Sequence, residues 1–239
     1  MKLIAAPSPN FDARTRPPDM LVLHYTGMPT GEAALARLRD PEAKVSAHYV
    51  VEEDGRVFTL VPEERRAWHA GRSSWRGERD VNGCSIGIEI VNPGHEFGYR
   101  PFPDAQIEAV IALVAAVRTR WTIPDARILG HSDVAPDRKE DPGERFDWEG
   151  LARNGVGLWP DGVPDLGTAE ALRDAAGLRA VRAALAVIGY RVAPEGALDP
   201  PLASVLRAFQ RHWRPAAVTG EADADTCVRA DAVARLCSR

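Results

Sequence analysis

Two apolar segments, MLVLHY at residues 20–25 and SIGIEIV at residues 85–91, decide the fold of the first part of this chain. Each has the length of a strand, is rich in aliphatic residues, and is bounded by glycine, proline or charged residues. Three further segments of the same kind are SAHYVV (46–51), RVFTLV (56–61) and ARILGH (126–131). The first part of the chain is therefore expected to contain a β-sheet of at least five strands.

Turn and helix signals lie between these strands. Glu53-Asp54-Gly55 predicts a tight hairpin, because Asp-Gly supplies the positive φ that such turns need. A helix is predicted over residues 32–39 and another after Pro103-Asp104. The second helix places its apolar residues on one face: Ile107, Val110, Ile111, Val114, Val117 and Trp121. Strands mixed with helices at this spacing predict an α/β (α+β) fold, with a mixed central β-sheet flanked by helices.

The composition changes near residue 150. The stretch GLARNGVGLWPDGVPDLG (150–167) is rich in glycine and proline and is typical of a linker. We therefore expect one domain at residues 1–155, a linker at 156–167 and a small three-helix domain at 168–239.

Three helices are predicted in this last domain. The first covers Leu178–Ile188 and stops at Gly189. Asp199 is the expected N-cap of the second, with Pro200 at its first position. The third is expected over residues 223–236. The loops GALD and GEAD, which precede the second and third helices, form a weak internal repeat.

Composition and charge exclude several classes of function. The formal net charge of −4 argues against a nucleic-acid partner. The best apolar run, Ala109–Val117, is too short to span a bilayer. Three cysteines without CxxC spacing indicate neither a disulfide framework nor a thiolate metal site. The N-terminal segment is a poor secretory signal. We expect a cytoplasmic monomer, or a periplasmic protein if a leader has been removed.

Two histidines follow strands and are candidates for metal binding. His24 and His131 each stand at the end of an apolar strand, and Asp141 follows ten residues after His131. Two imidazoles and one carboxylate are a sufficient protein ligand set for catalytic zinc. Spacing alone leaves ordinary surface or core histidines as the alternative. Glu89 stands between isoleucines, and its alternation with them favours a solvent-facing position.

Five sequence motifs follow one another along the chain: LHYTG, SAHYVV, AWHAGRSSW, NGCSIGIEIVNPG and GHSDVAPDRKEDPG. In this order they resemble the zinc-dependent N-acetylmuramoyl-L-alanine amidases related to phage T7 lysozyme and the peptidoglycan recognition proteins. The resemblance covers roughly residues 18 to 150. It implies that His24, His131 and Asp141 bind Zn²⁺. It also implies that Glu89 is the general base on a zinc-bound water, and that Lys139 stabilises the oxyanion.

Four further residues are candidates for substrate contact: Tyr25, His48, His69 and Asn82. The last three lie in words that match the family, and a structural role is the alternative for each. The C-terminal segment resembles the three-helix peptidoglycan-binding modules, through VRAALAVIGY, the two Gly-x-x-Asp turns and LRAFQRHW. A small helical packing domain is the alternative interpretation of this segment.

The resemblance implies hydrolysis of the amide bond between N-acetylmuramic acid, in its 1,6-anhydro form, and L-alanine of muropeptides during peptidoglycan recycling. The alternatives are a periplasmic amidase acting on polymeric peptidoglycan, a non-catalytic peptidoglycan-binding protein, and a zinc hydrolase of another amide. For each of these functions that involves peptidoglycan, the expected partner is a muropeptide or peptidoglycan.

Overall fold

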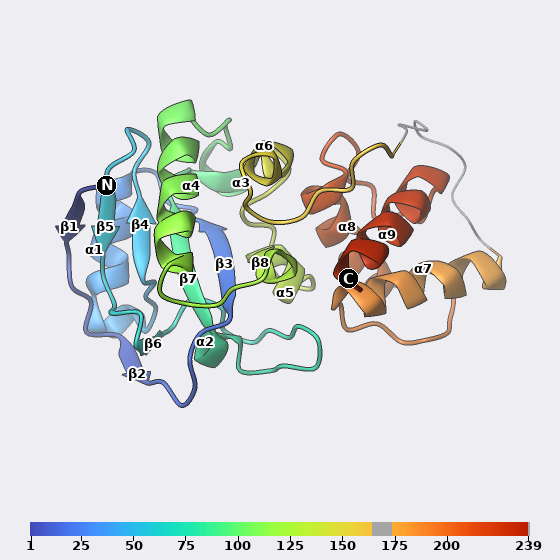
Figure 1. Ribbon diagram of the computed structural model, residues 1–239, viewed down its shortest axis with the longest axis horizontal. Coiled ribbons are helices and arrows are strands. Elements are labelled where there is room, and N and C mark those ends of the chain that lie inside the picture. Colours follow the sequence, from blue (N-terminus) through green and yellow to red (C-terminus); the bar gives the residue numbers. More distant parts are fainter. Residues whose placement is uncertain (164–173, 239) are drawn as a thin grey trace.

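A central β-sheet with helices on both faces lies beside a group of three further helices (Figure 1). The computed structural model describes residues 1–163 and 174–238. The six-stranded sheet has the order β1-β5-β4-β7-β3-β8, in which only β4 and β5 pair antiparallel. Its strands are β1 (Leu3–Ala5), β3 (Met20–Tyr25), β4 (Tyr49–Val51), β5 (Val57–Thr59), β7 (Ser85–Ile90) and β8 (Ile128–Gly130). The predicted mixed central sheet is thus confirmed.

Short elements complete this part of the chain. A separate antiparallel pair is formed by β2 (Phe11–Ala13) and β6 (Arg65–Ala67), which the sequence pattern did not predict. The helices are α1 (Gly31–Arg39), α2 (Val81–Cys84), α3 (Gly94–Phe97), α4 (Asp104–Arg118), α5 (His131–Val134) and α6 (Trp148–Arg153), with 3₁₀ turns at Pro41–Ala43 and Asp125–Arg127.

The two faces of the sheet have different neighbours because side chains alternate along each strand. Ile86, Ile88 and Ile90 of β7 pack together with Val110 and Val114 of α4. On the opposite face, Val50 of β4 packs against Leu38 of α1. Figure 1 shows α4 in front of the sheet and α1 behind it. Glu89 therefore lies on the α1 face of the sheet, and its alternation with the isoleucines is confirmed. The solvent-facing position that the alternation favoured is wrong, because the Oε2 atom of Glu89 is buried.

A short helix precedes the linker predicted at residues 156–167. Residues 148–153 form α6, in which the Asp147 carboxylate caps the helix by accepting from Gly150 N at 2.8 Å. Leu151 and Val156 are buried against Phe146 in the same apolar cluster as α4. Burial of these side chains packs the start of the glycine-rich stretch (150–167) against the sheet domain. The remainder of the predicted linker from residue 164, and the predicted start of the last domain at 168, lie outside the described residues.

Three helices, here called the C-terminal helices, follow: α7 (Ala175–Ile188), α8 (Pro200–Trp213) and α9 (Ala224–Cys237). All three predicted helices are present. Asp199 caps α8 as expected, accepting from Leu202 N at 2.9 Å, and Pro200 is its first residue. Within residues 1–163 and 174–238, no helix is long and apolar enough to cross a membrane.

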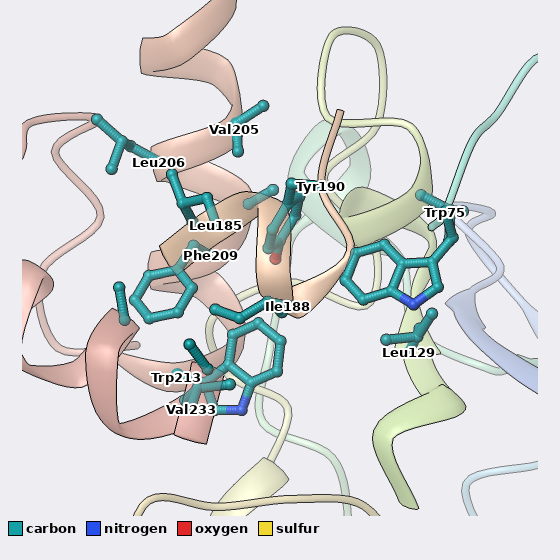
Figure 2. Packing of buried hydrophobic residues seen from close by; sticks show 14 of the residues in the cluster. Trp75, Leu129, Leu185, Ile188, Tyr190, Val205, Leu206, Phe209, Trp213 and Val233 are labelled. Carbon is teal, nitrogen blue, oxygen red and sulfur yellow. The ribbon is translucent and has the colours of Figure 1, made fainter. Parts of the chain in front are cut away.

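One apolar cluster joins the C-terminal helices to the rest of the chain. It combines Met20 and Val22 of β3 with residues of all three C-terminal helices. Figure 2 shows Trp75 and Leu129 beside Ile188 and Tyr190. The rings of Trp75 and Tyr190 meet edge to face, with centroids 4.9 Å apart. A Cβ at Gly189, which ends α7, would lie 2.5 Å from the indole of Trp75, so this contact requires glycine.

Candidate functional site

Parallel strands bring His24 and Glu89 to the same level of the sheet. The Cα atoms of His24 in β3 and Glu89 in β7 are register partners, and both side chains lie on the face opposite α4. Neighbouring residues in register on one face stand about 5 Å apart. Two groups separated by 65 positions in sequence therefore share one site.

His131 and Asp141 reach the same place from the edge of the sheet. Strand β8 lies next to β3, and His131 follows it directly as the first residue of α5. Asp141 belongs to the loop after α5, which is joined to that helix by the hydrogen bond from Ser132 N to the carbonyl of Asp141 (2.9 Å). All three side chains are buried.

The three side chains converge on one point. The Nδ1 atoms of His24 and His131 are 2.9 Å apart, and each lies 3.0 Å from Oδ2 of Asp141. Among the described residues these form a group able to hold a metal ion. Tetrahedral zinc with bonds of about 2.0–2.1 Å places its ligand atoms about 3.3 Å apart, close to the observed triangle.

Hydrogen bonds behind His24 determine which of its nitrogens carries the hydrogen. The carbonyl of Val81 can only accept, so the Ser85 hydroxyl donates to it (2.5 Å). Ser85 Oγ then accepts from Nε2 of His69 at 3.1 Å, which leaves Nδ1 of His69 as an acceptor. His24 Nε2 lies 3.0 Å from this atom and donates to it. The hydrogen of His24 is thus on Nε2, and Nδ1 is free to bind a cation.

His131 is held in the same tautomer by a backbone group. Its Nε2 lies 3.0 Å from the carbonyl oxygen of Ala70, which can only accept, so Nε2 carries a hydrogen. Both histidines therefore direct unprotonated Nδ1 atoms towards Asp141. This donor set fits a divalent metal ion. A histidine that binds a metal through one ring nitrogen usually donates a hydrogen bond from the other, as His24 and His131 do here through Nε2.

The charges of the site agree with these assignments. Burial, followed by the neighbouring His131, lowers the pKa of His24 to about 4, so the ring is neutral at pH 7. Burial would raise the pKa of Asp141, but the facing His131 and His24 more than offset it and hold this pKa well below its ordinary value. The site thus presents a neutral imidazole at His24 and an ionised carboxylate at Asp141, as metal binding requires.

Glu89 provides a carboxyl group beside this triangle. Its Oε2 atom is buried and has no hydrogen-bond partner among the residues that the structure describes. Burial first, and then the charge of Asp141, raise the pKa of Glu89 well above its ordinary value, while Lys139 acts in the opposite direction. A carboxyl with a raised pKa exchanges protons readily near neutral pH.

All these groups open into one pocket of about 280 Å³. Its walls come from the ends of β3 and β7, from α1, and from the loops that carry His69 and Lys139. Of the four predicted substrate contacts, Tyr25 and His69 line this pocket. Tyr25 also contacts His95, whose Nδ1 lies 3.0 Å from the phenol oxygen.

His48 and Asn82 lie behind the pocket. His48 is fully buried, and its Nδ1 accepts from Gly87 N at 2.9 Å. The side-chain oxygen of Asn82 accepts from the backbone N–H groups of His69 and Ala70 (3.1 and 2.7 Å). Both residues therefore shape the loop and strand that carry the site, which is the structural alternative considered for them.

Ser85 and the Ala70 carbonyl are functional groups that were not predicted from the sequence. Ser85 alternates with Ile86 and so shares a face with Glu89, which was a signal that this hydroxyl points towards the site. The role of a backbone carbonyl has no such signal. Gly87 is also required here, because a Cβ at this position would lie 2.4 Å from the ring of His69.

Comparisons with known proteins identify two matching regions. A family model described as N-acetylmuramoyl-L-alanine amidase matches residues 14–144, and one described as a putative peptidoglycan binding domain matches residues 174–229. The N-acetylmuramoyl-L-alanine amidase AmiD of Escherichia coli (strain K12) is 38% identical over 229 residues, which cover 90% of this chain and 81% of AmiD.

A second relative and a solved structure are also similar. The 1,6-anhydro-N-acetylmuramyl-L-alanine amidase AmpD of Citrobacter freundii is 36% identical over 161 residues, 59% of this chain and 84% of AmpD. The structure of E. coli AmiD in complex with the substrate anhydro-N-acetylmuramic acid-L-Ala-D-γ-Glu-L-Lys matches this fold with a TM-score of 0.80, at 36% identity, covering 94% of this chain and 92% of that one.

Proposed function

Because the chain belongs to the N-acetylmuramoyl-L-alanine amidase family, we propose that it hydrolyses the amide between anhydro-N-acetylmuramic acid and L-alanine, with zinc held by His24, His131 and Asp141. The observation that carries this proposal is the convergence of two unprotonated Nδ1 atoms and one carboxylate beside the unpartnered Glu89. A zinc ion in such a site acts as a Lewis acid towards the amide carbonyl and makes water a nucleophile at neutral pH.

Glu89 moves the proton in the proposed mechanism. Its raised pKa and unpartnered Oε2 suit a group that first accepts a proton from the attacking water. The same carboxyl then donates this proton to the nitrogen of the departing L-alanine. Without that donation the leaving group would be a strongly basic amide anion.

Lys139 stabilises charge on the amide oxygen. Its side chain lines the pocket, and it lies two residues before Asp141 on the same loop. As water attacks, the carbonyl oxygen becomes negative, and a fixed cation lowers the energy of that state more than that of the bound substrate. His69 contributes differently, since its hydrogen bond keeps Nδ1 of His24 unprotonated.

The proposed substrate is a small anhydro-muropeptide of peptidoglycan recycling. AmpD is named as a 1,6-anhydro-N-acetylmuramyl-L-alanine amidase, and the AmiD complex contains an anhydro-muropeptide. The similarity of both proteins to this chain supports the same substrate class here. Cytoplasmic recycling uses such soluble fragments, so we place the reaction there, and cell fractionation tests this location. A periplasmic role on polymeric wall is the second candidate, favoured by the match of residues 174–229 to a peptidoglycan-binding model.

The test compares hydrolysis of purified anhydro-muropeptide with hydrolysis of intact sacculi, using mass spectrometry to detect peptides that begin with L-alanine. We expect faster release from the soluble substrate. Glu89→Gln keeps the side-chain size and is expected to lower kcat by about 10²–10⁴-fold, with zinc content unchanged. A Glu89→Gln protein as active as the wild type would contradict the mechanism, and preference for sacculi would contradict the proposed substrate.

A further inference from the structure

The C-terminal helices meet the rest of the protein directly behind the proposed metal ligands. Asp133 lies in α5, two residues after His131, and its side chain is buried. Its Oδ1 accepts from the Tyr190 hydroxyl at 2.5 Å, and its Oδ2 accepts from Nδ1 of His212 at 2.7 Å. Gly130 N also donates to Oδ2, at 2.8 Å. Two of these three donors therefore come from the C-terminal part of the chain: His212 lies in α8, and Tyr190 lies two residues after the end of α7.

A second contact reaches the other ligand segment. Arg211, which precedes His212 in α8, donates to Oε1 of Glu140 at 2.5 Å, and its Nε lies 3.9 Å from Glu144. Glu140 is the neighbour of Asp141 in sequence. Two consecutive residues of α8 thus contact both chain segments that carry proposed ligands.

Packing fixes the His212 ring in the orientation that this contact needs. The imidazole stacks between Trp148 at 3.7 Å and Trp213 at 3.6 Å between ring centroids. Its Nε2 atom is buried and has no hydrogen-bond partner among the described residues. The ring is therefore held chiefly by stacking and by Asp133, and its Nδ1–H has no alternative direction.

The buried carboxylate of Asp133 depends on these donors. A buried ionised group is costly unless hydrogen bonds replace its lost hydration. Without Tyr190 and His212, the Gly130 N–H at the start of α5 would be its one remaining donor among the described residues. The first turn of α5 would then rearrange to reach other donors or solvent, and His131 is the first residue of that turn.

We infer that the C-terminal helices position the metal ligands, and that Tyr190, Arg211 and His212 are positioning residues for His131 and Asp141. This inference rests on the proposed zinc site. It assigns to these helices a task separate from any binding of peptidoglycan. Metal sites need their ligands within about 0.5 Å of the productive geometry, so a loosened α5 lowers metal affinity before it unfolds the protein.

The experiment measures zinc affinity of the full-length chain by competition with a chelating dye. Tyr190→Phe and His212→Phe remove one donor each and keep an aromatic ring in place. We expect each to weaken zinc binding by about 10–100-fold, the range typical of groups that orient metal ligands. With excess zinc, activity should recover with an unchanged KM, because neither residue contacts the substrate pocket.

Val233→Ala provides the matched control. Val233 is fully buried among the C-terminal helices, and its truncation destabilises them without removing a polar contact to α5. We expect its unfolding midpoint to fall while zinc affinity stays at the wild-type value. An equal loss of zinc affinity in this control would overturn the inference, since general destabilisation would then explain the effect.

Arg211→Met gives an independent measurement if the buried variants do not fold, because Glu140 is half exposed and can be solvated when Arg211 is lost. We expect weaker zinc binding here as well. If every folded variant among Tyr190→Phe, His212→Phe and Arg211→Met binds zinc with wild-type affinity, the inference is overturned. If the wild-type chain itself does not bind zinc, the proposed function fails instead, so the two failures are distinguishable.

Discussion

Replacing Ser85 with alanine tests whether the hydrogen-bond chain behind His24 determines zinc binding. The substitution removes the Oγ atom that lies 3.1 Å from Nε2 of His69 and 2.5 Å from the carbonyl oxygen of Val81. A buried donor left without its acceptor costs about 1–3 kcal/mol. His69 is expected to reduce this cost by moving its hydrogen to Nδ1.

This change of tautomer is transmitted to the ligand. A hydrogen on Nδ1 of His69 would face the Nε2–H of His24 at 3.0 Å, so the His24 hydrogen must move to its own Nδ1. Nδ1 of His24 is the proposed zinc ligand. Zinc binding must then return the hydrogen of His24 to Nε2, which is the less stable tautomer in the variant. The cost above corresponds to roughly a 5–150-fold loss in zinc affinity, which overlaps the 10–100-fold typical of such partners.

The assay combines zinc competition titration with urea unfolding of the metal-free protein. Ser8→Ala is the control, because Ser8 is also buried and donates a hydrogen bond of similar length to Leu38 O (2.6 Å), in α1 and outside the hydrogen-bond chain behind His24. Both variants should lose stability, and only Ser85→Ala should lose zinc affinity. Equal zinc affinity in the two variants would refute the reasoning about the His24 tautomer.

Three further changes have defined outcomes. Lys139→Met should lower kcat by about 10²–10³-fold with little change in KM, since the cation acts on charge that forms during the reaction; an unchanged kcat would exclude this role. Gly87→Ala places a Cβ 2.4 Å from the His69 ring, so we expect about 1–3 kcal/mol of destabilisation in urea unfolding and weaker zinc binding. Burial lowers the pKa of His48 from 6.5 to about 4, so the unfolded chain binds a proton that the folded protein rejects. The stability that His48 contributes therefore falls as pH drops from 6.5 towards 4, by up to about 1.4 kcal/mol per pH unit. In the metal-free protein, His48→Asn should flatten the measured slope, and an identical slope would argue that His48 is protonated in the folded state.

Periodicity along the chain predicted the elements that carry the site. The strands that contain His24 and Glu89 follow from their apolar patterns, and the cap at Asp199 was predicted to the residue. Local patterns could not predict that His24 and Glu89 are register partners, because pairing of parallel strands depends on contacts 65 positions apart. The roles of His24, His131 and Asp141 came from resemblance and remain a proposal supported by their geometry.

Contacts between side chains that are distant in sequence could not be predicted from local sequence patterns. Nothing in the AWHAG word distinguishes a substrate contact from a hydrogen-bond partner of His24, which is the position His69 takes. The glycine-rich stretch after residue 150 likewise predicted separation of two domains. The complementary surfaces of Trp75 and Tyr190, which join them, are recognisable only once both parts are folded.

The apolar cluster that joins Met20 and Val22 to the C-terminal helices restricts how this chain can be recombined. Binding modules are often exchanged between proteins as independent units, but here the boundary passes through a continuous core. A chain shortened before α7 would expose the backs of β3 and β8 and would tend to aggregate. Replacing the C-terminal helices with a wall-binding module would therefore require a new surface beneath Trp75, and a longer tether alone would not suffice.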